Sequence, residues 1–242
     1  MKILHALLFL LAVNSTLFAD SWQRVYLATY PRSGNHWMRN LIEEATHVAT
    51  GSVYIDREPP HLKKPFAWGG YAAKKGVEGN CRYPTEGEIV VLKTHYPVKP
   101  LTEFDLQPSS IVVRIVRHPI DAFYSHFLHA KKNTLPDDGI IPRWHVKKSV
   151  KNWKKFESYW NNQDNVFTIR YEDLLDHPHE NFKKMMDAMG FDLSDEAIKR
   201  ALDKFPPISG SQLKHLQDYR AKDLEFIWKK LGPYMQQYGY TI

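Results

Sequence analysis

The stretch "TYPRSGNHWMRNLIEE", Thr29 to Glu44, joins a strand-like segment to a helix-like segment through a short turn. Mostly apolar residues lead into the turn, and beyond Gly34 apolar side chains recur with the period of a helix. A strand, a tight turn and the start of a helix present backbone N–H groups to an anion. The usual P-loop spelling, with two glycines and a Lys-Ser or Lys-Thr pair, is absent, and Arg32 stands inside the turn. The stretch therefore predicts an anion-binding loop of unusual composition.

The composition fits one large domain with a sizeable core, since 43% of the 242 residues are hydrophobic and 13% are aromatic. The formal net charge is +6, which favours anionic partners. Charge alone leaves nucleic acid, an anionic membrane and small polyanionic substrates open, as well as a generally basic surface. The single cysteine, Cys81, excludes an intramolecular disulfide and a zinc site built on cysteines.

Residues 1–19 predict a secretory signal peptide or a short N-terminal anchor, followed by one domain over residues 20–242. The apolar run from Ile3 to Val13 follows one lysine and is too short to cross a bilayer comfortably. A buried hydrophobic N-terminal helix is the alternative. We therefore expect an exported or membrane-anchored protein that meets the membrane only through this segment, or a cytoplasmic protein if the segment is buried.

Four β-rich runs alternate with helical periodicity, which predicts an α/β fold with a parallel, P-loop-NTPase-like sheet flanked by helices. The runs are 24–30, 89–93, 110–116 and 166–171. Helical stripes are expected at 150–160, at 182–189, after the N-cap residue Ser194, and at about 223–231, ending at Gly232-Pro233. The region 56–85 has no clear period and predicts a long loop.

Cationic or titratable side chains follow all four predicted strands. The strands are followed in turn by Pro31 to Trp37, Lys93 to Pro97, Arg117 to Pro119, and Arg170 to Asp173. Because ligands of an open α/β sheet bind beyond the carboxyl ends of its strands, these residues should meet at one edge. The sequence thus predicts an anion site that also holds a base.

These motifs together resemble the sulfotransferases that use 3′-phosphoadenylyl sulfate, abbreviated PAPS. "YPRSGNHW" is similar to their 5′-phosphosulfate loop Y-P-K-S-G-T-T-W, and "VRHPIDAFYSHF" to their 3′-phosphate motif, in which an arginine and a serine lie eight residues apart. "LKTHYP" resembles the segment with their catalytic histidine, and "RYEDLLDHP" a later strand end. The matching order covers about residues 24–190. A finer similarity points to sulfotransferase domains found beside WSC carbohydrate-binding modules.

The resemblance implies a role for each matching residue. The 5′ phosphosulfate would bind at Arg32, Ser33, Gly34, Asn35, His36 and Trp37. The 3′ phosphate would bind Arg117 and Ser125. Tyr171 is also assigned to donor binding, and its strand end would place it near the base. Arg32 would stabilise negative charge on the leaving phosphate, where the cytosolic relatives use lysine. Trp37 has two open roles, stacking on adenine or packing in the core.

The catalytic residues implied are His95, Arg32 and Lys93. A neutral imidazole at His95 suits the removal of a proton from a hydroxyl acceptor, which could be a sugar. Lys93, two residues earlier on an extended strand, would point to the same side and help hold the transferring group. The resemblance calls for no metal, although His36, His118 and His126 crowd the motifs. It also implies a small-molecule donor rather than nucleic acid as partner.

Two departures keep other functions open. Asn35 and His36 replace two threonines of the 5′-phosphosulfate loop, and the family's C-terminal R-K-G-x-x-G-D segment is missing. Ser209, Ser211, Lys214 and Arg220 are candidates to replace it on the 3′ phosphate. A noncatalytic PAPS- or glycan-binding relative is therefore one alternative. A nucleotide phosphotransferase is another, against which the missing P-loop lysine argues.

Overall fold

The structure is a computed structural model of the chain. It describes residues 23–54, 67–68, 81–82, 84–85, 87–99, 106, 110–131, 139–207 and 213–242. The expected leader at 1–19, most of the expected loop at 56–85, and both Ser209 and Ser211 lie outside the described residues. Among the described helices, none has the length and apolar character needed to cross a membrane.

A largely parallel sheet forms the centre of the molecule, in the strand order β3-β2-β4-β1-β5-β6. Five strands run parallel, and the two-residue strand β3 pairs antiparallel to β2 at one edge. The strands are β1 (Gln23–Thr29), β2 (Gly51–Ser52), β3 (Ala67–Trp68), β4 (Ile89–Thr94), β5 (Ile111–Val116) and β6 (Val166–Arg170). The predicted parallel α/β sheet is confirmed, and the four predicted strand runs match β1, β4, β5 and β6 to within a residue at each end.

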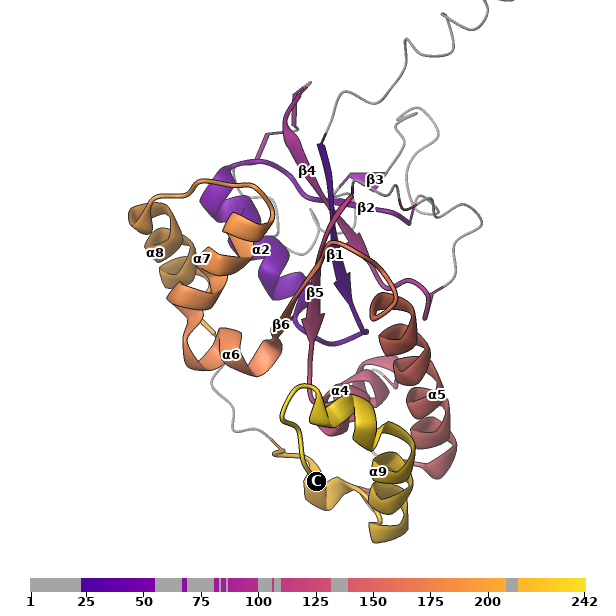
Figure 1. The fold of residues 1–242 in the computed structure, drawn as a ribbon. Helices are drawn as coiled ribbons and strands as arrows, with labels where there is room; N and C mark the ends of the chain where they lie inside the picture. Colours follow the sequence, from indigo (N-terminus) through magenta and orange to yellow (C-terminus); the bar gives the residue numbers. More distant parts are fainter. Residues whose placement is uncertain are drawn as a thin grey trace, which may run out of the picture.

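Helices cover both faces of the sheet (Figure 1). One face carries α2 (Asn35–Thr46), α6 (Tyr171–Asp176), α7 (Pro178–Ala188) and α8 (Asp195–Lys204). The other carries α4 (Pro119–Ala130), α5 (Arg143–Trp160), the short 3-10 helix η1 (Leu216–Asp218) and α9 (Ala221–Gln236). Each face encloses its own apolar cluster, and the central strands β1, β4 and β5 are buried on both sides, which explains their continuous apolar runs.

The helix predicted to stop at Gly232-Pro233 continues instead to Gln236, so that prediction is wrong. Proline lacks the N–H that would donate to the preceding turn. Leu231 and Met235, four residues apart on one helix face, are both fully buried, and their packing outweighs the lost hydrogen bond. The predicted cap at Ser194 is confirmed, since its Oγ accepts a hydrogen bond from the Ala197 N–H at 3.2 Å.

The strand register brings the predicted site residues to one edge of the sheet. Ala28 of β1 pairs with Thr94 of β4, and Thr29 pairs with Ile115 of β5. Val116 in turn pairs with Arg170 of β6. The segments that follow these four parallel strands therefore emerge side by side, at the edge where open α/β sheets bind ligands.

Candidate functional site

The loop between β1 and α2 has the backbone of an anion-binding turn. Arg32 has φ +70° and the helix N-cap Gly34 has φ +85°, so two residues of the turn lie in the left-handed region. The first helical hydrogen bond runs from the Met38 N–H to the Gly34 carbonyl, so the N–H groups ahead of it point out of the helix end. The Ser33 side chain is fully buried, and its Oγ has no partner among the described residues. Such a turn suits a phosphate-like group.

Gly34 cannot be replaced without disturbing this turn. A Cβ atom at this position would lie 2.6 Å from Cδ2 of Tyr171, which is shorter than any normal contact. The positive φ is a second obstacle, because a residue with a side chain is strained there. Tyr171, the first residue of α6, thus packs directly on the loop and joins the end of β6 to the end of β1.

Two arginines that are 85 residues apart in sequence meet beside the loop. The Arg117 guanidinium donates to the Arg32 carbonyl at 2.7 Å, and Arg32 Nε donates to Ser125 Oγ at 3.1 Å. The Arg117 guanidinium also lies 4.7 Å from the centre of the Tyr171 ring. The structure therefore brings together the two predicted phosphate motifs, including Arg32, Arg117, Ser125 and Tyr171.

This cluster carries positive charge that the described protein does not neutralise. Neither Arg32 nor Arg117 forms an ion pair with a described carboxylate. Loss of surrounding water and then the nearby charge of Arg117 lower the pKa of Arg32. Two guanidinium groups held this close gain from an anion placed between them, and guanidinium geometry matches phosphate oxygens.

His95 lies at the end of β4 and is held in one tautomer. Its Nδ1 is 2.8 Å from the Thr29 carbonyl oxygen, which can only accept, so Nδ1 carries the proton. Nε2 then carries the lone pair and has no partner among the described residues. Burial, followed by the charge of Lys93, lowers the pKa of His95 to about 3. The imidazole is therefore neutral at pH 7 and presents a free acceptor nitrogen, as a general base requires.

Thr29 and Tyr54 are two supporting residues that the sequence analysis missed. The Tyr54 hydroxyl accepts the His95 backbone N–H at 2.8 Å, and its ring stacks on the imidazole with centroids 6.4 Å apart. Thr29 holds the imidazole through its carbonyl. Both are ordinary strand-end or loop residues in the sequence, so only the position of Thr29 directly before the loop was a usable signal.

The surroundings of three loop residues could not be predicted from the sequence. The Asn35 amide was expected to face the phosphate, but it donates to Thr29 Oγ1 at 3.2 Å and to the Leu27 carbonyl at 3.4 Å, because the side chain turns inward. Trp37 is partly buried, and its Nε1 donates to the Phe205 carbonyl at 2.9 Å. The His36 side chain is exposed at the helix end. Stacking of Trp37 on adenine stays a prediction.

The segment 213–220, which holds two of the candidates to replace the missing C-terminal motif, packs against α4. The Leu213 N–H donates to Asp121 Oδ2 at 3.0 Å, and the His215 ring stacks on Tyr124 with centroids 4.2 Å apart. Asp121 lies one helical turn before Ser125 on the same side of α4, whereas the neighbouring Tyr124 faces another direction and is buried. Lys214 is exposed between these two contacts.

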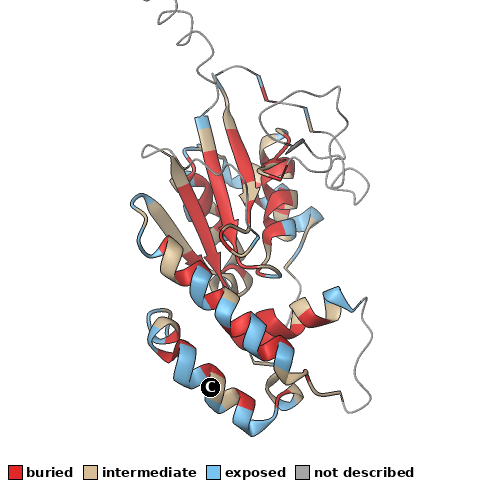
Figure 2. Cartoon of the chain, turned by 90° about the vertical axis from the view of Figure 1, so that its right-hand side faces the viewer, coloured by how far each residue is buried: buried red, intermediate tan, exposed pale blue. Residues whose placement is uncertain are grey.

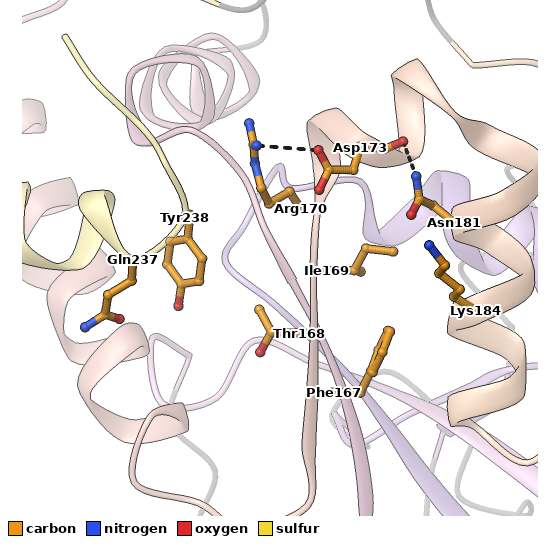
Figure 3. A pocket seen from close by; sticks show the side chains of 9 residues that line it. All are labelled: Phe167, Thr168, Ile169, Arg170, Asp173, Asn181, Lys184, Gln237 and Tyr238. Atoms are coloured by element: carbon orange, nitrogen blue, oxygen red, sulfur yellow. Dashed lines mark hydrogen bonds and ion pairs between the residues drawn. The ribbon is translucent and has the colours of Figure 1, made fainter.

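A separate hollow of about 510 Å³ lies along the outer strand β6 (Figure 3). It is lined by residues of β6 and α7 and by Gln237 and Tyr238, and Arg170 at its margin pairs with Asp173 at 3.5 Å. None of the residues assigned to donor binding or catalysis lines it, although Arg170 and Asp173 of the predicted strand-end set do. Among the described residues, no group of three histidine, cysteine or acidic side chains could hold a metal ion.

Comparisons with known proteins agree on one family. A sequence model of the sulfotransferase domain matches residues 23–206. The WSCD family member CG9164 of Drosophila melanogaster is 25% identical over 190 residues, which cover 73% of this chain and 53% of that protein. Human sulfotransferase 6B1 is 27% identical over 186 residues, covering 72% and 57%. This chain thus spans little more than half the length of these relatives.

Solved structures share the fold at low sequence identity. A retinol dehydratase in complex with androsterone and the inactive cofactor PAP matches with a TM-score of 0.57 and 17% identity, over 91% of this chain and 82% of that one. The sulfotransferase STF9 from Mycobacterium avium matches with a TM-score of 0.59 and 11% identity, over 98% and 82%. The family match extends over well more than half of the chain, and the chain therefore belongs to the sulfotransferase domain family.

Proposed function

We propose that this chain transfers a sulfuryl group from PAPS to a hydroxyl acceptor. The observation that carries the proposal is the contact between the two phosphate motifs, in which Arg117 donates to the Arg32 carbonyl and Arg32 donates to Ser125. PAPS carries a phosphosulfate and a separate phosphate on one adenosine. A site with two neighbouring cationic motifs suits such a donor better than a nucleotide with phosphate at one position only.

The 5′ phosphosulfate is assigned to the loop and the 3′ phosphate to Arg117 and Ser125. The buried, unpartnered Ser33 hydroxyl and the outward N–H groups at the start of α2 support the first assignment. The Arg117 guanidinium, which forms no ion pair with a described carboxylate, supports the second. We assign Lys214 as a further 3′-phosphate contact, because the adjacent Leu213 N–H donates to Asp121, which lies one helical turn before Ser125 on α4.

In the proposed reaction the acceptor oxygen forms a bond to sulfur while the bond from sulfur to the bridging phosphate oxygen breaks. The bonding electrons leave with 3′,5′-diphosphoadenosine, and the acceptor proton passes to Nε2 of His95. Arg32 stabilises the charge that grows on the leaving oxygen, with Lys93 beside the transferring group. The Nδ1 hydrogen bond to Thr29 supports this role, since it keeps the lone pair of His95 on the ring nitrogen opposite.

The acceptor is assigned to the carbohydrates as the finer part of the proposal. The resemblance to domains found with carbohydrate-binding modules supports it, as does the similarity to a WSCD family member. Retinol dehydratase, which shares the fold, has been solved with androsterone and with retinol, so members of the fold also bind ligands that are not sugars.

A binding and turnover experiment tests the proposed function against its two rivals. Calorimetry should show much tighter binding of 3′,5′-diphosphoadenosine than of AMP, and mass spectrometry should detect a sulfated product from PAPS and a panel of hydroxyl acceptors. Binding without any product would instead favour a noncatalytic relative. Phosphate transfer from ATP without sulfate transfer from PAPS would favour a phosphotransferase. Substituting Arg32→Lys should retain much of the turnover, whereas Arg32→Ala should lose it, because the charge at the leaving group is what matters.

A further inference from the structure

The outward side of α5 has an unusual composition for a helix of this protein. Every exposed residue of this 18-residue helix is a lysine or a tryptophan. We call these residues the lysine face: Trp144, Lys147, Lys148, Lys151, Lys154 and Lys155. Their spacing of three and four residues places them along one side, and a view from the α5 side shows exposed turns along the helix (Figure 2).

Other exposed helix surfaces in the molecule mix the two signs of charge. Lys184 of α7 pairs with Glu180 at 2.6 Å, and Lys199 of α8 pairs with Asp203 at 2.6 Å. By contrast, no lysine of the lysine face pairs with an acidic side chain of the described residues. A solvated helix surface usually alternates charges in the manner of α7 and α8. By contrast, the charged residues of the lysine face are all positive over about 16 Å of helix, from Trp144 to Lys155.

The lysine face borders the candidate site at both ends. At the N-terminal end of α5, the Trp144 ring lies 5.5 Å from that of His145, which lies 5.4 Å from that of His126, the neighbour of Ser125. At the other end, Lys155 Nζ donates to the Pro97 carbonyl at 3.0 Å, two residues after His95. The two ends of the lysine face thus reach the segment that follows His95 and, through two histidine rings, the segment that carries Ser125.

We propose that the lysine face docks an acidic polysaccharide and presents one of its hydroxyl groups to His95. Such a polymer carries anionic groups for the lysines and a hydroxyl on almost every sugar unit. Exposed Trp144, 57% accessible, supplies a flat apolar surface on which a sugar ring can lie. The docking itself stands on the charge and position of α5, and only the acceptor role rests on the proposed function.

Other anionic partners fit this surface less well. A helix that lies on a membrane carries several apolar residues on its outward side, whereas Trp144 is the single apolar member of the lysine face. Single-stranded nucleic acid is usually held by a series of aromatic platforms, and the lysine face has one aromatic residue. An acidic peptide matches the charge but offers few hydroxyl groups.

A charge-neutralising variant tests the docking. K147Q/K151Q/K154Q removes three charges while keeping residues that favour a helix. The matched control is K222Q/K229Q/K230Q, which removes three exposed charges from α9. The probe is unsulfated chondroitin, which has carboxylates and free hydroxyl groups, with neutral dextran and polyglutamate for comparison. We expect the first variant to bind chondroitin about tenfold more weakly with a shallower salt dependence, because exposed charge contacts are individually modest and screened by salt.

Several results would overturn the docking. These are no chondroitin binding by the unaltered chain, equal losses in the α9 control, or polyglutamate binding as tight as chondroitin. W144A sharpens the test, since it should weaken binding of chondroitin more than that of polyglutamate, and equal weakening would argue against a sugar platform. Sulfation of small neutral alcohols with no chondroitin binding would leave the proposed function standing and end the docking proposal. Chondroitin binding through the lysine face without sulfate transfer to any acceptor would leave the docking proposal standing and end the proposed function.

Discussion

The donor side and the acceptor side of the candidate site hold their positive charges in different ways. On the donor side, Arg32 and Arg117 are fixed by hydrogen bonds to Ser125 and to the loop backbone. On the acceptor side, the lysines of α5 are exposed and have no acidic partner among the described residues, and of these only Lys155 has a described hydrogen bond, to the Pro97 carbonyl. Fixed guanidinium groups suit a ligand of one geometry, while mobile ammonium groups suit a flexible ligand of varying geometry. If the two proposals hold, we expect strict recognition of the nucleotide and tolerant recognition of the acceptor.

The largest effect that separates the two sides should come from His95. We expect His95→Ala to lower turnover by about 10²–10⁴, because general-base catalysis contributes on that scale, while the affinity for 3′,5′-diphosphoadenosine is unchanged. Single-turnover kinetics and calorimetry measure the two quantities. His129→Ala, an exposed histidine at the end of α4, is the control. Near-normal sulfate transfer by His95→Ala would show that another group is the base.

A substitution at Arg117 should affect nucleotide binding on the donor side and leave the acceptor side unchanged. Arg117→Ala should remove most of the preference for 3′,5′-diphosphoadenosine over AMP, about 1.5–3 kcal/mol for a charge-assisted hydrogen bond. Its KM for the acceptor should stay the same, because the described contacts of the guanidinium are with the Arg32 carbonyl and the Tyr171 ring and not with His95. Calorimetry with both nucleotides measures the preference, and Arg200→Ala on α8 serves as the control. An unchanged preference would contradict the assignment of the 3′ phosphate to Arg117.

Gly34 tests whether the donor side depends on loop geometry as well as charge. Gly34→Ala keeps every charge but introduces a Cβ that would lie 2.6 Å from Tyr171, at a φ of +85°. We expect a donor affinity about tenfold lower and a lower melting temperature, in line with the cost of a strained backbone position. Gly87→Ala is a useful control, because that glycine also has positive φ but its Cβ would meet nothing within 4 Å. Equal donor affinities for the two variants would argue against the packing of Tyr171 on the loop.

The smallest expected effect is an acid sensitivity of the acceptor side. Burial lowers the pKa of His95 to about 3 and that of His126 to about 4, so the folded protein resists their protonation. The unfolded chain takes up these protons near pH 6.5, so stability should be full above that pH and fall as the pH drops toward 3. Melting temperatures measured between pH 7.5 and about 4.5 should show this decline. The decline should be smaller in His95→Gln, and an identical decline would mean that other groups cause it.

Much of the fold and the composition of the site could be predicted from the sequence. Apolar runs and helical periods are local patterns, and for that reason they located β1, β4, β5 and β6 and the helices between them. The parallel arrangement then required the strand ends, and with them Arg32, His95, Arg117 and Tyr171, to meet at one edge. The end of α9 was misjudged because the local signal of Pro233 competes with the burial of Met235, and burial is a tertiary quantity.

The sequence by itself determined the set of chemical groups and their order along the chain, because motifs and periodicity are patterns of neighbouring residues. What only the tertiary structure decided was which groups touch. The tautomer of His95 depends on a carbonyl 66 residues away, and Asn35 turns inward because Thr29 and Leu27 offer it partners. The lysine face likewise could be defined only from the structure, because tertiary packing decides which residues of α5 are exposed. Such contacts join residues distant in sequence, and local patterns carry no information about them.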